Sequence, residues 1–328
     1  MRDQHNLSRA QISPQALKVL YGLKEAGFEA YLVGGCVRDL LLGFEPKDFD
    51  VATDASPEQV HKIFKRSRLI GRRFKLVHVG YGREVIEVAT FRAPPEAEQH
   101  IDDQGKIVQD NVFGTLAQDA WRRDFTINAL YYNIRDFSIV DYTGGIADLQ
   151  AGKVRLIGDV ETRYREDPVR MLRAVRFIGK LGLTLDEATE AHIKELAELL
   201  QAIPAARLFD ETLKLYLSGN AVVTHQLLVK YGLFSYLFPE SDRLISNQEN
   251  EVAAKLLLIA LENTDKRIEQ GKPVTPAFLI AAILWAPMLA RWQHYQDKNI
   301  PLMPALQKAA NEVISAQVQR VAIPKRFT

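Results

Sequence analysis

The sequence predicts an α+β fold, in which a mixed head of strands and helices is followed by an all-helical remainder. Short apolar runs bounded by glycines and turn residues recur between residues 30 and 91, as expected for strands. From about Asp159 onward these strand signals vanish, and apolar residues recur with the 3.6-residue period of helices. Clear examples of that helical period are residues 186–200, 207–217 and 251–261.

The composition is ordinary for a globular protein, since 47% of the 328 residues are apolar and 25% are charged. The single cysteine, Cys36, leaves no partner for a disulfide and no cysteine-based zinc site, and it favours a reducing, cytoplasmic location. The longest uncharged apolar run, residues 276–290, contains Pro287 and is too short to span a bilayer. We therefore expect a buried helix there and no membrane insertion.

Positive charge is concentrated in two bands, although the formal net charge is only +1. Residues 62–75 carry seven Lys or Arg and no acid, and residues 151–182 carry eight against four acids. Such bands suit a polyanionic partner. For a single charge run, a solvated basic face is the simpler alternative.

The elements of the head follow from capping and turn signals. Ser13 and Pro14 predict the start of a helix that ends at Gly27, and an apolar strand over residues 31–33 follows. A glycine pair then opens a helix over residues 36–42. The further expected elements are a strand around residues 48–51, a helix over 56–65, strands over 69–71, 75–81 and 84–91, and a mobile polar loop over 93–112.

Asp48 and Asp50 are one residue apart in a strand-like run, so they should share a face while Phe49 points into the core. Mg²⁺ typically takes one or two carboxylates from a protein and further oxygen ligands from substrate phosphates. Two such ions can activate an attacking hydroxyl and neutralise a leaving pyrophosphate. Exposed acids at a strand end are the alternative, which the pair alone does not exclude.

Gly34 and Gly35 strengthen the metal interpretation, because they allow a phosphate to approach backbone N–H groups at the start of a helix. Arg38, on the first turn, would add a forked donor. The alternative is a tight turn in which Arg38 pairs with Asp39.

Asp124, in the run WRRDFTINAL, is a third candidate carboxylate. It could complete a site for two metal ions, and Arg123 could reach a ribose or a phosphate. A surface Arg–Asp pair, which would contribute little energy, is the alternative.

Asp167 and Pro168 predict the start of an amphipathic helix. Three arginines of this helix lie within an arc of about 120°, opposite an apolar face. The arginines are Arg170, Arg173 and Arg176, and the apolar residues are Met171, Leu172, Val175 and Ile178. The stripe could bind a nucleotide or RNA, or simply face solvent.

Four runs resemble the motifs of the class II template-independent nucleotidyltransferases, which include bacterial poly(A) polymerases and tRNA CCA-adding enzymes. In chain order they are LVGGCVRDLLLG, PKDFDVAT, RRDFTINAL and REDPVRMLRAVRF. The resemblance covers about residues 30–240. It implies a nucleotidyltransferase palm over residues 1–157, a helical neck for base recognition over 158–218 and a helical RNA-binding body over 219–328.

The resemblance also implies roles for single residues. Asp48 and Asp50 would bind two Mg²⁺ ions, and Asp124 would be the third catalytic carboxylate. The substrate ATP would be bound by Gly34, Gly35, Arg38, Arg123, Asp167, Arg170, Arg173 and Arg176.

The choice of product depends on a separate segment. A carboxylate and a guanidinium match the donor and acceptor of adenine, but cytosine presents the same order, so Asp167 and Arg170 alone do not separate ATP from CTP. Residues 69–79, LIGRRFKLVHV, resemble a signature of the bacterial poly(A) polymerases that their CCA-adding relatives lack. We therefore predict transfer of AMP to RNA 3′ ends. The alternatives are CCA addition to tRNA and a non-catalytic RNA-binding protein of the same fold.

Overall fold

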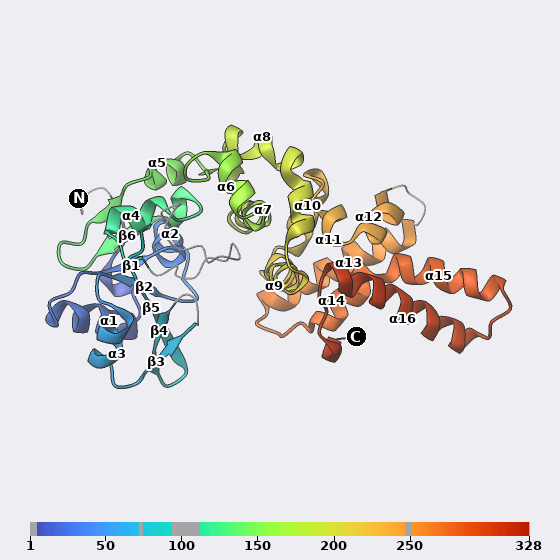
Figure 1. Ribbon diagram of the computed structural model, residues 1–328, viewed down its shortest axis with the longest axis horizontal. Helices are drawn as coiled ribbons and strands as arrows, with labels where there is room; N and C mark the ends of the chain where they lie inside the picture. The colour runs from blue at the N-terminus through green and yellow to red at the C-terminus, as the bar shows by residue number, and fades with distance from the viewer. Residues whose placement is uncertain (1–4, 72–74, 94–111, 247–250, 328) are drawn as a thin grey trace, which may run out of the picture. The chain divides into compact units, whose positions relative to one another are not determined.

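The computed structural model describes residues 5–71, 75–93, 112–246 and 251–327. The chain divides into two compact units, residues 1–158 and residues 159–328 (Figure 1). The first unit contains the main sheet and the second is almost entirely helical. The α+β prediction is therefore confirmed.

The first unit is built on a seven-stranded mixed sheet with the order β3-β4-β5-β2-β1-β6-β7. Neighbouring strands are antiparallel, except that β2 and β5 run parallel. The strands are β1 (Ala30–Val33), β2 (Asp50–Thr53), β3 (Ser67–Ile70), β4 (Leu76–Tyr81), β5 (Glu84–Thr90), β6 (Leu130–Asn133) and β7 (Ile139–Asp141).

Side chains of each central strand point alternately to the two faces of the sheet. Both faces are apolar here, and helices pack against each of them. Leu32 of β1 and Val51 of β2 belong to the core formed with α1 (Pro14–Glu25), α2 (Gly35–Leu41) and α3 (Pro57–Ile63). Val33 and Ala52 belong to a second, smaller core formed with α4 (Leu116–Trp121). The unit is completed by α5 (Gly145–Gln150) and the two-residue β8 (Lys153–Val154).

The capping signals at the starts of α1 and α3 are confirmed. The Ser13 side chain accepts hydrogen bonds from the first turn of α1, and Ser56 forms a capping box with Gln59 at the start of α3. The three expected strands after α3 correspond to β3, β4 and β5. The expected loop over residues 93–112 lies almost wholly outside the described residues, as do residues 72–74 of the basic band.

The strand expected around residues 48–51 begins only at Asp50, so the prediction that Asp48 lies within it is wrong. The partner strand β1 pairs no further than Val33, opposite Asp50, because Gly34 with φ 76° turns the chain away. Asp48 thus precedes β2. Phe49 is buried in the core, as expected.

The second unit consists mainly of helices, and β9 (Thr184–Leu185) is a short strand among its described residues. The helices are α6 (Val160–Glu166), α7 (Val169–Leu181), α8 (Glu187–Leu196), α9 (Ala205–Tyr216), α10 (Ala221–Lys230), α11 (Phe234–Leu237), α12 (Pro239–Ser246), α13 (Glu251–Glu269), α14 (Pro276–Ile283), α15 (Trp285–Asp297) and α16 (Leu302–Arg320).

The single helix expected over residues 276–290 is instead two helices, α14 and α15, separated at Leu284. Pro287 has no N–H to donate to the carbonyl of Ile283, so one continuous helix would lose that bond. The Ser241 hydroxyl donates to this carbonyl instead, at 2.8 Å. Among the described residues, no helix combines the length and apolar character needed to cross a membrane.

Candidate active site

Asp50 is the first residue of β2 and lies opposite Glu87 of β5 in the parallel register. Residues in register on adjacent strands point to the same face, so the two carboxylates are neighbours. The pKa of Asp50 is raised from 3.8 to about 6, first by burial and then by the charges of Glu87 and Asp48, while Arg123 opposes the shift. Burial and neighbouring negative charge therefore both act on the carboxylate of Asp50 at the start of β2.

Glu87 is a candidate that the sequence did not reveal. Along β5, Ile86 and Val88 are buried while Glu87 is half-buried, which is an alternation that the residue types alone leave ambiguous. The signal in the sequence that could have pointed to Glu87 was a single acid on one face of an otherwise apolar strand. Its importance depends on the β2–β5 pairing, which joins segments far apart in the sequence.

The guanidinium of Arg123 is held beside the glycine turn. Its Nε donates to the Tyr131 hydroxyl at 2.8 Å, and its Nη2 donates to Asp119 Oδ2 at 2.9 Å. A Cβ added to Gly34 would lie 3.8 Å from Arg123 Nη1, so this turn faces the guanidinium. Burial alone would lower the pKa of Arg123, but Tyr131 and Asp119 outweigh it and raise this pKa above its ordinary value.

Gly34 and Gly35 form the expected turn between β1 and α2. Gly34 has φ 76° and ψ −133°, a conformation that favours glycine. Its N–H donates to the carbonyl of Leu130 at 3.4 Å. The glycine turn is therefore formed as expected, and α2 begins at Gly35.

Arg38 is paired with Asp39, the arrangement that the sequence left as an alternative to phosphate binding. The guanidinium is 4% exposed and donates from Nε and Nη2 to Asp39 Oδ1, at 2.8 and 2.6 Å. Its Nη1 donates to Asn128 Oδ1 at 2.6 Å. These contacts tie α2 to the segment that follows Asp124.

Asp124 follows α4 in the chain and is half-buried, and its Oδ1 accepts from the N–H of Phe125 at 2.8 Å. In the described part of the chain, no group of three or more His, Cys, Asp or Glu residues is arranged to hold a metal ion. A cation held by Asp48 and Asp50 would need oxygen atoms from substrate phosphates as well. Carboxylates supplemented in this way are a donor set that fits Mg²⁺.

The base-reading candidates belong to the second unit. Asp167 separates α6 from α7, and α7 begins at Val169, one residue later than expected. Asp167 Oδ2 accepts from Arg207 Nη2 at 2.7 Å, a contact that joins residues 40 positions apart. Arg170 donates to Glu166 Oε2 at 3.0 Å.

The amphipathic pattern of α7 is confirmed on its apolar side. Met171, Leu172 and Val175 are fully buried, and Ile178 is nearly so. The three arginines on the other side, Arg170, Arg173 and Arg176, are half-buried. The stripe is therefore partly shielded and does not lie fully in solvent.

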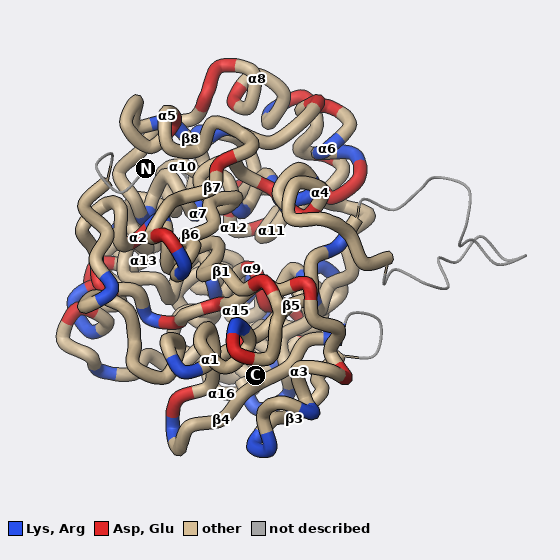
Figure 2. Tube along the Cα trace, turned by 90° about the vertical axis from the view of Figure 1, so that its left-hand side faces the viewer, with Lys and Arg blue, Asp and Glu red and all other residues tan. Residues whose placement is uncertain are grey.

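The basic band of the first unit surrounds β3, where Figure 2 shows Lys and Arg in blue. Leu69 and Ile70 of this strand are about 40% exposed (41% and 40%), so apolar and basic side chains share the edge of the sheet. On the next strand, Nε2 of His78 lies 3.4 Å from Glu87 Oε2. The segment that distinguished poly(A) addition thus contacts a residue in register with Asp50.

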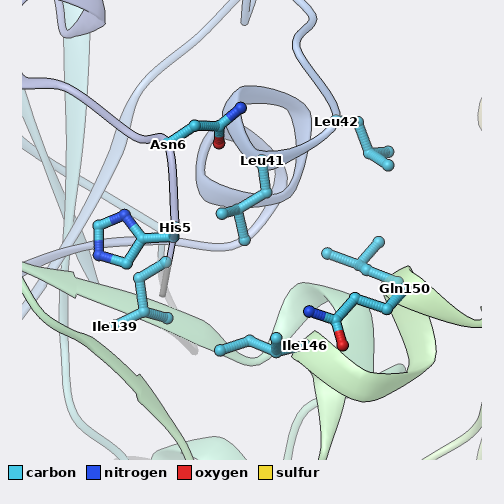
Figure 3. A pocket seen from close by; sticks show the side chains of 8 residues that line it. His5, Asn6, Leu41, Leu42, Ile139, Ile146 and Gln150 are labelled. Atoms are coloured by element: carbon cyan, nitrogen blue, oxygen red, sulfur yellow. The ribbon is translucent and has the colours of Figure 1, made fainter. Parts of the chain in front are cut away.

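A cavity of about 680 Å³ in the first unit lies elsewhere (Figure 3). It is bordered by the end of α2, by Ile139 of β7, and by Ile146 and Gln150 of α5, with His5 at its edge. None of its lining residues is among the candidates for chemistry. The cavity is therefore separate from the candidate active site.

Three protein-family models match the chain. They are "Poly A polymerase head domain" over residues 30–155, "Probable RNA and SrmB- binding site of polymerase A" over 182–245 and "Polymerase A arginine-rich C-terminus" over 298–328. The matches follow one another along the chain in that order.

Known proteins of two activities are similar to the chain. Poly(A) polymerase I of Salmonella typhi is 50% identical over 334 residues, which covers 100% of this chain and 72% of that protein. The CCA-adding enzyme of Lactobacillus johnsonii is 35% identical over 265 residues, covering 77% of this chain and 65% of that protein. The solved structure of the Bacillus stearothermophilus CCA-adding enzyme in complex with CTP is 28% identical, with a TM-score of 0.59, over 93% of this chain and 83% of that one.

Proposed function

The chain belongs to the bacterial poly(A) polymerase family of nucleotidyltransferases, and we propose that it transfers AMP from ATP to RNA 3′ ends at the Asp48/Asp50 site. The enzyme is a polynucleotide adenylyltransferase. The observation that carries the site assignment is the buried carboxylate of Asp50 in register with Glu87, where burial, Glu87 and Asp48 together raise the pKa of Asp50 to about 6. A divalent cation bound at this position would offset the negative charge of these carboxylates.

Asp48 and Asp50 would hold Mg²⁺, with two ions expected from the family. When bound, Mg²⁺ supplies activation of the attacking hydroxyl and neutralisation of the leaving pyrophosphate. The chain's own contribution is to orient the triphosphate. Arg123, fixed beside the Gly34 turn, places positive charge where phosphate oxygens would lie. Asp124 would support the site from the adjacent segment.

The second unit would supply base recognition and RNA binding. Asp167 and Arg170 match the hydrogen-bonding edge of adenine, and Arg173 and Arg176 lie on the same helix. The match to a probable RNA-binding region over residues 182–245 supports an RNA partner. We propose a base-reading neck over 158–218, an RNA-binding body over 219–328 and a cytoplasmic location.

The alternative function is CCA addition, because the chain is also similar to CCA-adding enzymes. Poly(A) addition is favoured by the 50% identity over the whole chain, compared with 35% over 77% of it. Both activities use the same chemistry, so the difference must lie in which nucleotide is accepted and when addition stops.

The test is to incubate the purified enzyme separately with ATP and with CTP. One RNA substrate is unstructured, and the other is a tRNA that lacks its CCA end. We expect long A tails on the unstructured RNA and little use of CTP. Addition of C, C and A followed by arrest would establish CCA addition instead. If a correctly folded sample incorporated no nucleotide, the non-catalytic alternative would be favoured.

The site assignment is tested by Asp48→Ala under the same conditions. We expect loss of AMP addition with an unchanged thermal unfolding profile, because Asp48 is exposed and precedes the sheet. Retained addition by the purified variant would contradict the assignment of metal binding to this pair.

A further inference from the structure

Asp119 of α4 is a buried acceptor on which several donors converge. It is 1% exposed, and neither it nor its contacts were evident from the sequence. Its Oδ1 accepts from Arg122 Nε at 2.9 Å and from the N–H of Arg92 at 3.2 Å. Its Oδ2 accepts from Arg123 Nη2 at 2.9 Å and from the Tyr131 hydroxyl at 2.7 Å.

Tyr131 closes this network from the opposite side. Its hydroxyl accepts from Arg123 Nε at 2.8 Å while donating to Asp119, so the three side chains form a closed triangle. The guanidinium carbon also lies 5.2 Å from the centre of the Tyr131 ring. Tyr131 is fully buried, and burial raises its pKa, which keeps the hydroxyl protonated as a donor.

Tyr131 also lies in register with the candidate catalytic residues. Asp50 of β2 pairs with Val33 of β1, and Val33 pairs with Tyr131 of β6, so all three point to the face covered by α4. Two strand spacings separate Asp50 from Tyr131, which is about 10 Å. Arg123 bridges this interval, because it contacts Tyr131 and acts on the charge of Asp50.

We propose that Asp119 and Tyr131 are positioning residues that fix the Arg123 guanidinium over the Gly34 turn before ATP binds. This inference rests on the proposed function, in which Arg123 binds the triphosphate or ribose of ATP. An unrestrained arginine loses considerable side-chain freedom when it orders around a ligand. The hydrogen bonds of Arg123 with Asp119 and Tyr131 order its side chain before ATP binds. The loss of side-chain entropy then does not weaken ATP binding, because the donor is already oriented.

The test uses Tyr131→Phe, which removes the hydroxyl and keeps the ring. Tyr132→Phe is the matched control, because Tyr132 is equally buried but belongs to the core on the opposite face of the sheet. Steady-state kinetics with ATP at saturating RNA give kcat and KM separately. We expect Tyr131→Phe to lower kcat/KM for ATP roughly tenfold, mainly through KM, since it removes hydrogen bonds to a charged group.

A double-mutant cycle separates positioning from a merely structural role. In an Arg123→Met background, Tyr131→Phe should change kcat/KM by less than about twofold, because there is no guanidinium left to position. A tenfold loss that persists in the Arg123→Met background would overturn the proposal, as would a change of less than about twofold in the wild-type background.

Asp119→Asn is a second variant, expected to act in the same direction as Tyr131→Phe; kinetics unchanged by Asp119→Asn would overturn the role of Asp119. Failure of the proposed function is distinguishable, because it would appear as an absence of A tailing by the wild-type enzyme. Failure of this inference would leave wild-type tailing intact.

Discussion

Replacing Asp50 by asparagine should stabilise the first unit when no divalent cation is present, while abolishing nucleotidyl transfer. Burial and the neighbouring Glu87 and Asp48 make ionisation of Asp50 unfavourable in the folded protein. Asparagine has nearly the same shape and carries no charge to desolvate. Asp50 would therefore be required for activity while lowering the stability of the folded protein.

The size of the effect follows from the pKa of Asp50, which rises from 3.8 to about 6 on folding. This difference corresponds to about 3 kcal/mol at about 1.4 kcal/mol for each pH unit. Because the folded-state pKa is the higher one, the stabilisation from protonated Asp50 is complete below pH 3.8 and is lost as the pH rises through about 6. The Asp50→Asn variant has no ionisable group at this position, so its stability does not fall through this pH range for that reason.

The assay is thermal unfolding of wild type and Asp50→Asn in EDTA across a pH series. At pH 8 we expect the variant to melt about 6 °C higher, and at pH 5 the gain should be roughly half as large. Added Mg²⁺ should raise the melting temperature of the wild type more than that of the variant, since it binds the ionised site. Asp210→Asn, at an exposed position on α9, is the control for neutralising an acid.

The reasoning would be refuted if Asp50→Asn were no more stable than wild type at pH 8 in EDTA. A gain of equal size at pH 5 and pH 8 would also refute it, because the gain would then be unrelated to ionisation of Asp50.

Three further predictions concern other parts of the chain. Glu87→Gln should raise the Mg²⁺ concentration needed for half-maximal tailing roughly tenfold, because it removes one of the charges beside Asp50; an unchanged Mg²⁺ titration would exclude Glu87 from the site. Burial lowers the pKa of His225 to about 4, so the second unit should lose about 3 kcal/mol of stability as the pH falls from 6.5 to 4. Urea midpoints should show this loss in wild type and not in His225→Phe. Gly145→Ala should destabilise the first unit by more than about 2 kcal/mol, since its Cβ would lie 2.2 Å from the carbonyl oxygen of Thr126; a melting temperature within 2 °C of wild type would contradict this.

Local signals were sufficient for much of the fold. Helix starts at Ser13 and Ser56 could be predicted because their side chains bond to backbone N–H groups only a few residues away. The strand starting at Asp50 was placed too early, because the end of its partner β1 decides where pairing stops. Likewise, the division at Leu284 involves a hydrogen bond from Ser241 to Ile283, two residues that are 42 positions apart in the sequence.

The candidate site could be predicted only where its residues are close together in the chain. Asp48 and Asp50 stand out as a pair, and Gly34 stands out as the start of a turn. Glu87 and Tyr131 did not, since each becomes relevant only through its register with a neighbouring strand. No pattern within β5 or β6 carries that information, because only the pairing of all seven strands places these residues in one row across the sheet.

Arg38 and Asp50 show how charge compensation separates structural from functional groups. The Arg38 guanidinium is 4% exposed and is matched within the chain by Asp39 and Asn128, so its charge is already compensated. Asp50 is largely buried and is influenced by the charges of Glu87 and Asp48; Arg123 opposes these effects only in part, so the pKa of Asp50 is raised to about 6. Uncompensated charge of this kind destabilises the fold and is retained where a ligand completes the balance. On this argument we expect the cation and the triphosphate to bind at Asp50 and Arg123, while nucleotide binding by Arg38 stays a prediction.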